Sequence, residues 1–196
     1  MGFIFSTKRL MSQVTRCIEA QGTTLTAMVD GTYKVSTQSW VIANIGICCC
    51  YYNTNENKYS KTFLMAGLCF MQAKTKAAYL EFCTRLSEKI SQYTGFNFAP
   101  RFVISDHSDA IASGTLIAWP DSKILKCWPH LTRNLSKNLH RLKNAENAKK
   151  VTAHVYFLHH LPTHDAFQNL VPAVLAIGKI CCMKMTLRNG FIKLTY

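Results

Sequence analysis

The chain has 196 residues, which suits one domain or one domain with an appendage, and its 48% hydrophobic content excludes a largely disordered protein. No apolar segment reaches the length of about 18 residues that a membrane span requires, and no secretory signal is recognisable at the N-terminus. The net charge is +13, and seven basic residues lie against one acid between Lys126 and Lys150. This cluster predicts a polyanionic partner, most simply nucleic acid, with a solvated helix face as the plainer interpretation.

Nine cysteines are spread unevenly along the chain, and Cys48, Cys49 and Cys50 adjoin in one apolar segment. Neighbouring residues of a strand point to opposite faces, so this triplet is poorly arranged for disulfide bonds. We expect most of the cysteines to be small buried side chains of a protein in a reducing compartment.

The first part of the chain predicts a helix followed by three strands. Apolar residues at helical spacing predict the helix over Ser6–Ala20, which Gly22 ends. The segment Trp40–Tyr51 is nearly apolar throughout, as expected of a central strand that is buried on both faces. Strands at Thr24–Val29 and Lys61–Met71 flank it, and the short connections between the three predict an antiparallel meander.

The spacing of apolar residues then changes to three and four. This pattern predicts an amphipathic helix over Thr75–Tyr93, with Gly95 as its C-terminal stop. Beyond it we expect, in order, a strand at Arg101–Ser105, a helix at Ala110–Ile117 capped by Ser108, and a strand at Lys123–Cys127. The fold class is therefore α/β, with three antiparallel strands followed by strands that alternate with helices.

Pro129 fits the first turn of a further helix that separates apolar from basic residues. The leucines between Leu131 and Leu142 share one face, and Arg133, Lys137 and Arg141 lie on the opposite face. Packing on one side and positive charge on the other suit a helix that lies beside a phosphate backbone.

Asp30 and Asp106 differ from most of the other acids because each directly follows a run of strand residues. In the expected order the two strands can lie side by side, which would bring both carboxylates to one rim of the sheet. A divalent cation such as Mg²⁺ or Mn²⁺ would relieve their repulsion and could serve phosphodiester chemistry. Each aspartate also has a plainer interpretation: Asp30-Gly31 is a hairpin-turn signal, and Asp106 can form an Asx turn or cap a helix.

Three motifs in this order resemble the mutator-like (MULE) transposase domain: Asp30-Gly-Thr-Tyr-Lys34, Ile104-Ser-Asp-His-Ser-Asp-Ala-Ile111 and Cys127-Trp-Pro-His130-Leu-Thr-Arg-Asn134. The resemblance implies an RNase-H-like fold, a DDE carboxylate triad, Mg²⁺-dependent cleavage and strand transfer in DNA transposition, and a nuclear location. By position, Asp30 and Asp106 match the first two acids of the triad. Cys127 and His130 match the Cys/His signature of the family.

The third acid that the resemblance implies, a glutamate on a later helix, has no evident counterpart. After His130 the only acids are Glu146, which comes too soon, and Asp165, which opens a helix that resembles part of the family's insertion. We therefore expect transposition chemistry to be incomplete in this chain. The alternative function is a non-catalytic, transposon-derived DNA-binding module. An enzyme unrelated to nucleic acid is least expected, because no phosphate-binding glycine loop or nucleophile motif is present.

Cys127 and His130 supply two ligands, whereas structural zinc normally takes four, and no second close pair follows at finger spacing. We do not expect a structural zinc site. The plainer roles are that Cys127 packs at a strand end and that His130 contacts phosphate or caps its helix.

The sequence predicts a helical lead-in over residues 1–22, an RNase-H-like core over residues 23–145 and a mainly helical segment over residues 146–196 that belongs to a truncated insertion. DNA is the expected partner, membrane association is not expected, and a homo-oligomer is compatible with the sequence. The candidate DNA contacts are the basic residues Lys34, Arg133, Lys137 and Arg141.

Overall fold

The computed structural model describes residues 2–32, 40–106, 108–140, 144–180, 184–188 and 191–195. The chain divides into two compact units, Met1–Cys127 and Trp128–Tyr196. This division differs from the expected boundaries, because residues 1–22 belong to the first unit and the basic helix after Pro129 belongs to the second. Among the helices that are described, none combines the length and apolar character needed to cross a bilayer.

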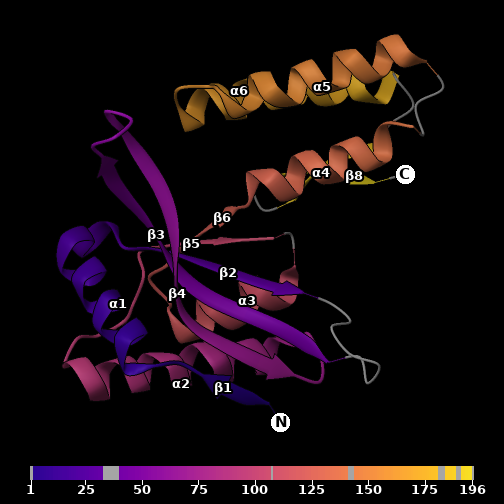
Figure 1. Ribbon diagram of the computed structural model, residues 1–196. Helices are drawn as coiled ribbons and strands as arrows, with labels where there is room; N and C mark the ends of the chain where they lie inside the picture. Colours follow the sequence, from indigo (N-terminus) through magenta and orange to yellow (C-terminus); the bar gives the residue numbers. More distant parts are fainter. Residues whose placement is uncertain are drawn as a thin grey trace. The chain divides into compact units, whose positions relative to one another are not determined.

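The first unit is built on a six-stranded mixed sheet (Figure 1) with the order β1-β4-β3-β2-β5-β6. The strands β1 to β4 pair antiparallel, whereas β5 pairs parallel with both β2 and β6. The bounds are β1 Phe3–Phe5, β2 Thr26–Thr32, β3 Val41–Asn53, β4 Lys58–Met71, β5 Phe102–Ser105 and β6 Lys123–Lys126. The expected α/β class, with three antiparallel strands followed by strands that alternate with helices, is confirmed.

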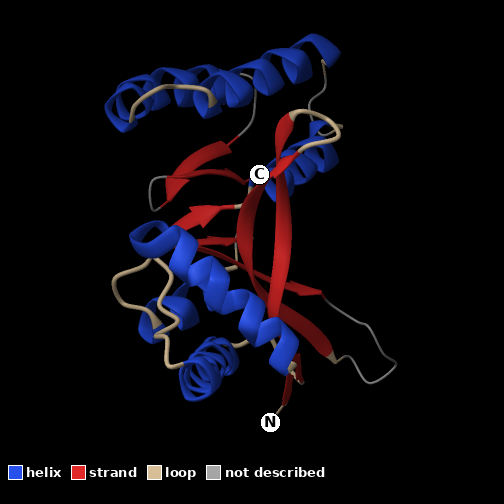
Figure 2. Ribbon diagram, turned by 60° about the vertical axis from the view of Figure 1, so that its left-hand side comes forward, coloured by secondary structure: helices blue, strands red, loops and turns tan. Residues whose placement is uncertain are grey.

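Three helices pack with the sheet (Figure 2): α1 (Lys8–Gln21), α2 (Lys76–Thr94) and α3 (Asp109–Ala118), and a single 3-10 turn (Gly22–Thr24) follows α1. One buried cluster contains alternate residues of the strands together with apolar residues of all three helices. Helix caps explain the boundaries: the Thr75 and Ser108 side chains accept hydrogen bonds from the first turns of α2 and α3. Gly95 ends α2 in the left-handed conformation, with φ of 74°, as its sequence position predicts.

The strands β3 and β4 form a hairpin that is longer than the strand beside it (Figure 1), since β2 pairs with β3 only as far as Ile47. Beyond this point Cys48–Asn53 pair with β4 alone, and Tyr51 and Tyr52 are exposed. The prediction that β3 is buried on both faces is therefore wrong. Its apolar run extends past β2: α1 contacts Cys48 and Cys49 there, whereas Tyr51 and Tyr52 are about half exposed.

The short N-terminal strand β1 was not predicted from the sequence. Its three residues pair with the end of β4, from Phe3 opposite Phe70 to Phe5 opposite Leu68. A three-residue strand is too short to show a period, so only its long-range pairing identifies it. The helix α1 that follows contributes Met11 and Val14 to the core, so the N-terminal segment is an integral part of this unit.

The cysteines are less buried than expected. Of the seven in the described part of the chain, Cys69, Cys83 and Cys127 are buried, Cys17, Cys48 and Cys49 are half-buried, and Cys50 is exposed. The exposure of Cys50 and the partial exposure of Cys48 and Cys49 follow from the extension of β3 beyond its pairing with β2. The Sγ atoms of Cys17 on α1 and Cys49 on β3 are 3.1 Å apart.

The second unit contains the helices α4 (Trp128–Leu139), α5 (Ala145–His159) and α6 (His164–Ile180), followed by the two-stranded antiparallel sheet β7 (Lys184–Arg188) and β8 (Phe191–Thr195). Leu135 of α4 packs with Val151 and Val155 of α5, and Trp128 stacks on His159 with ring centroids 3.6 Å apart. Helices dominate this unit, as expected. The sequence predicts the last of these helices from about Asp165 to Met183; α6 agrees with it as far as Ile180, and residues 181–183 lie outside the described residues.

Candidate metal and DNA site

Asp30 and Asp106 occupy equivalent positions on neighbouring parallel strands. Val29 of β2 lies opposite Ser105 of β5, and each aspartate is the next residue along its chain. Neighbouring strands are about 4.8 Å apart, so the two residues share one rim of the sheet. Both are partly exposed, whereas Val29 and Ser105 are buried. The expectation that these two strands lie side by side is confirmed.

The Asp30-Gly31 pair does not form a hairpin turn. Both residues lie within β2, where Asp30 is opposite Asn44 and Gly31 is opposite Ala43 of β3. The hairpin interpretation of this dipeptide is therefore wrong. Asp30 Oδ1 accepts a hydrogen bond from the Gly31 N–H at 2.8 Å, which orients the carboxylate at the rim.

The Asx-turn interpretation of Asp106 is correct for one of its two oxygens. Asp106 Oδ1 accepts a hydrogen bond from the Ser108 N–H at 2.8 Å, and the Ser108 hydroxyl in turn caps α3. The other oxygen, Oδ2, lies 3.7 Å from Lys74 Nζ. The turn holds the carboxylate in place without using its second oxygen, so a structural and a ligand role for Asp106 are compatible.

Lys74 is a residue of this site that sequence reasoning missed. It lies in the connection between β4 and α2, and its side chain is only 6% exposed. A Cβ atom on Gly31 would lie 2.7 Å from Lys74 Cε, so the lysine runs directly beside the residue that follows Asp30. The predicted meander could have identified Lys74, because antiparallel pairing of three strands returns the end of β4 to the rim where β2 ends.

Lys126 brings a second positive charge to the same rim. It ends β6 opposite Ser105, and its Nζ donates to the backbone oxygen of Asp106 at 3.5 Å. The next residue, Cys127, is buried and its N–H donates to Ser105 O at 2.7 Å. The plainer prediction, that Cys127 packs at a strand end, is confirmed.

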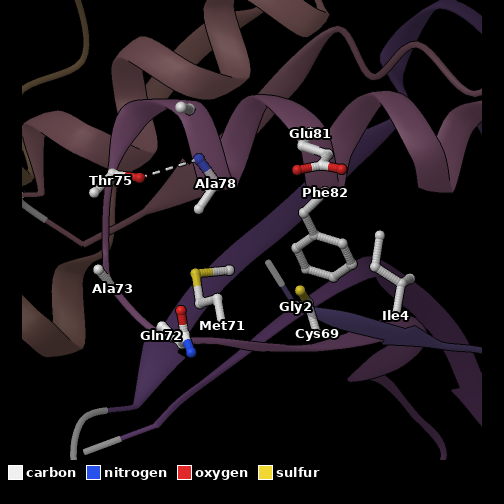
Figure 3. A pocket seen from close by; sticks show the side chains of 11 residues that line it. Gly2, Ile4, Cys69, Met71, Gln72, Ala73, Thr75, Ala78, Glu81 and Phe82 are labelled. Atoms are coloured by element: carbon white, nitrogen blue, oxygen red, sulfur yellow. Dashed lines mark hydrogen bonds between the residues drawn. The ribbon is translucent and has the colours of Figure 1, made fainter.

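A cavity of about 300 Å³ lies beside the backbone that carries Lys74 (Figure 3), but it is distinct from the aspartate pair. It is lined by β1, the end of β4 and the start of α2, and neither Asp30 nor Asp106 takes part. In Figure 3 the Thr75 side chain turns to the N–H of Ala78 at the start of α2. Thr75 therefore fixes the backbone immediately after Lys74.

Of the remaining predicted site residues, His130, Arg133 and Lys137 lie in the described part of the second unit. In α4, Arg133 and Lys137 are exposed and Leu135 is buried, which confirms the predicted separation of charged and apolar faces. His130 is half-buried, and its Nδ1 has no hydrogen-bond partner among the residues described. Lys34 and Arg141 lie outside the described residues.

Within the described ranges, no group of three or more His, Cys, Asp and Glu side chains is arranged to hold a metal ion. The two acids considered for the third position, Glu146 and Asp165, lie in the first turns of α5 and α6 in the second unit. Glu146 forms an ion pair with Lys150, with 2.8 Å between Oε1 and Nζ.

Comparison with known proteins identifies one family. The family model described as the MULE transposase domain matches residues 26–134, which is more than half of the chain. Comparison with curated proteins finds no match. The matched range includes both aspartates, Lys74 and the Cys127–His130 motif.

Proposed function

The chain belongs to the MULE transposase domain family, and we propose that Asp30 and Asp106 are its metal-binding carboxylates for chemistry on transposon DNA. The observation that carries the proposal is their equivalent register on the parallel strands β2 and β5. Two carboxylates with this placement suit Mg²⁺ or Mn²⁺, which take oxygen ligands and complete their shells with water and substrate phosphates.

The residues of the chain would hold and orient such an ion. The N–H groups of Gly31 and Ser108 each fix one oxygen of an aspartate; the other oxygen of each carboxylate would bind the ion, and in Asp106 that oxygen lies 3.7 Å from Lys74 Nζ. When bound, a divalent cation would activate a water or a 3′-hydroxyl and stabilise the departing oxygen in phosphodiester cleavage. With two carboxylates and no third acid beside them in the described residues, we expect weak metal binding and little strand transfer by this chain alone.

Titration calorimetry with Mn²⁺ tests the metal site. We expect the wild-type chain to bind Mn²⁺ and the Asp30→Ala, Asp106→Ala double variant to lose that binding. The matched control is the Glu88→Ala, Asp121→Ala double variant, which removes the same charge from exposed positions away from the rim. Undiminished binding in the Asp30 and Asp106 variant would remove the proposal.

The exposed basic face of α4 favours a second function, a non-catalytic DNA-binding module. Arg133 and Lys137 project from a helix whose Leu135 is anchored against α5, as a helix that contacts phosphates requires. Under this proposal the chain binds DNA but the aspartate variants leave binding unchanged. DNA as the partner, residence in the nucleus and assembly into a homo-oligomer all belong to the proposal, and microscopy of a tagged chain and analytical ultracentrifugation test the last two.

A further inference from the structure

Lys74 places a positive charge beside Asp106 of the aspartate pair, and the inference that follows rests on the proposed function. Its Nζ lies 3.7 Å from Asp106 Oδ2, on the oxygen that the Asx turn leaves unused. Its Cε and Nζ lie 2.7 and 3.4 Å from the position that a Cβ atom of Gly31 would occupy. The ammonium group therefore stands between the end of Asp106 and the residue that follows Asp30.

The position of Lys74 is determined by the fold. The strand β4 ends at Met71, which pairs with Val41, and α2 begins two residues after Lys74 with Thr75 as its cap. The backbone on both sides of Lys74 is thus fixed, and its side chain is 6% exposed, compared with 21% for Asp106. A surface ion pair contributes little, but a largely buried lysine beside a carboxylate is a substantial local charge.

We propose that Lys74 is a positioning residue that acts as the resident cation of the aspartate pair: it neutralises Asp106 when no metal is bound and competes with a divalent cation for that carboxylate. Two cations on one carboxylate oxygen repel each other, so the ammonium group has to move away when a metal ion binds. Metal affinity is then set partly by how readily Lys74 leaves Asp106.

DNA supplies the reason why such competition is useful. The lysine side chain has four flexible carbons, so its ammonium group can move while its backbone stays fixed between β4 and α2. A DNA phosphate at the rim is an anion that can receive the displaced ammonium group. Metal and DNA therefore bind with positive coupling through Lys74, and the aspartate pair takes up metal poorly until a phosphate is present.

The test measures Mn²⁺ affinity by titration calorimetry for the wild-type chain and Lys74→Met, each alone and with a short duplex oligonucleotide. Without DNA, we expect Lys74→Met to bind Mn²⁺ about tenfold more tightly, a gain of about 1.4 kcal/mol. Lys74→Arg, which keeps the charge, should not bind more tightly. Lys76→Met is the matched control, because it removes the same charge from an exposed position two residues away and should leave the affinity unchanged.

With DNA, the Mn²⁺ affinity of the wild-type chain should rise, whereas that of Lys74→Met should rise much less. Circular dichroism and thermal denaturation verify folding, and Lys74→Gln serves if the methionine variant does not fold. A folded variant whose Mn²⁺ affinity is equal to or lower than that of the wild type overturns the inference and assigns Lys74 a structural ion pair.

The same titrations separate this inference from the proposed function. If the wild-type chain binds Mn²⁺ through Asp30 and Asp106 but Lys74→Met shows no gain, only the inference fails. If neither the wild-type chain nor Lys74→Met binds Mn²⁺, the metal site itself is disproved and the inference fails with it. If Lys74→Met binds Mn²⁺ and the wild-type chain without DNA does not, the result supports both the metal site and the inference.

Discussion

Gly31 and Lys74 approach each other so closely that a methyl group at position 31 would lie 2.7 Å from Lys74 Cε and would overlap the Tyr79 hydroxyl. Gly31 lies in regular strand β2, so this contact, and not a special backbone conformation, is what requires glycine there. The absence of a side chain next to Asp30 is what gives Lys74 its place at the rim.

Replacing Gly31 with alanine should therefore destabilise the fold by about 1–3 kcal/mol, because the new methyl group overpacks a filled site. Urea denaturation measures the loss. The loss should be smaller in a Tyr79→Phe background, since the hydroxyl that the methyl group meets is then absent. Equal stability of Gly31→Ala and the wild type would contradict this prediction, because it would show that the Lys74 and Tyr79 side chains move aside without a cost in free energy.

The basic face of α4 predicts a salt-dependent interaction with DNA. If Arg133 and Lys137 each contact a phosphate, replacing both with alanine should reduce the log–log slope of affinity against salt concentration by about 1.8, or about 0.9 per lost contact. Fluorescence anisotropy of labelled duplex DNA at several salt concentrations measures the slope. The Arg85→Ala, Lys89→Ala double variant on α2 removes the same charge and should leave the slope unchanged. An unchanged slope in the α4 variant would argue against a phosphate role for this helix.

At Gly114, helix α3 packs closely against the backbone of α2. A Cβ atom there would lie 2.8 Å from the backbone oxygen of Lys76 and 2.9 Å from the backbone nitrogen of Leu80. Glycine to alanine in a helix interior normally gains up to about 1 kcal/mol. Here the backbone of α2 has to move, so we expect Gly114→Ala to lower the free energy of unfolding by about 1–3 kcal/mol instead. Thermal and urea denaturation measure it, with Ser113→Ala as the neighbouring control. A stabilised Gly114→Ala protein would contradict the close helix contact.

The burial of cysteines predicts which thiols react in the folded protein. Burial, and then the negative charge of Glu81, raises the pKa of Cys69 to about 11, and burial raises the pKa of Cys83 further. The thiolate is the nucleophile, so at pH 8 both thiols remain protonated and react slowly with iodoacetamide, whereas exposed Cys50 is alkylated before either of them. Labelling of Cys69 should increase as the pH rises towards 11. Peptide mass spectrometry measures the order, and equal rates at pH 8 for Cys50 and Cys69 would contradict it.

Local patterns in the sequence were sufficient for most helices and strands. The spacing of apolar residues along α2, its cap at Thr75 and its stop at Gly95 are all encoded within one short segment, and the structure agrees with them. The family resemblance and the strand order also placed Asp30 and Asp106 on neighbouring strands. Where a single segment contains its own period and its own boundary residues, sequence alone determines the element.

The three-dimensional structure decided which distant residues meet. Lys74 looks like an ordinary lysine in a loop until antiparallel pairing of β3 and β4 returns the chain to the rim and Gly31 leaves room for its side chain. Likewise, β1 exists only through its pairing with β4, and Tyr51 and Tyr52 at the end of β3 are exposed because β3 extends beyond its pairing with β2. The spacing of apolar residues shows which faces of one segment are buried. Contacts between distant residues depend instead on how far the neighbouring strands extend, and the sequence of one segment does not contain that information.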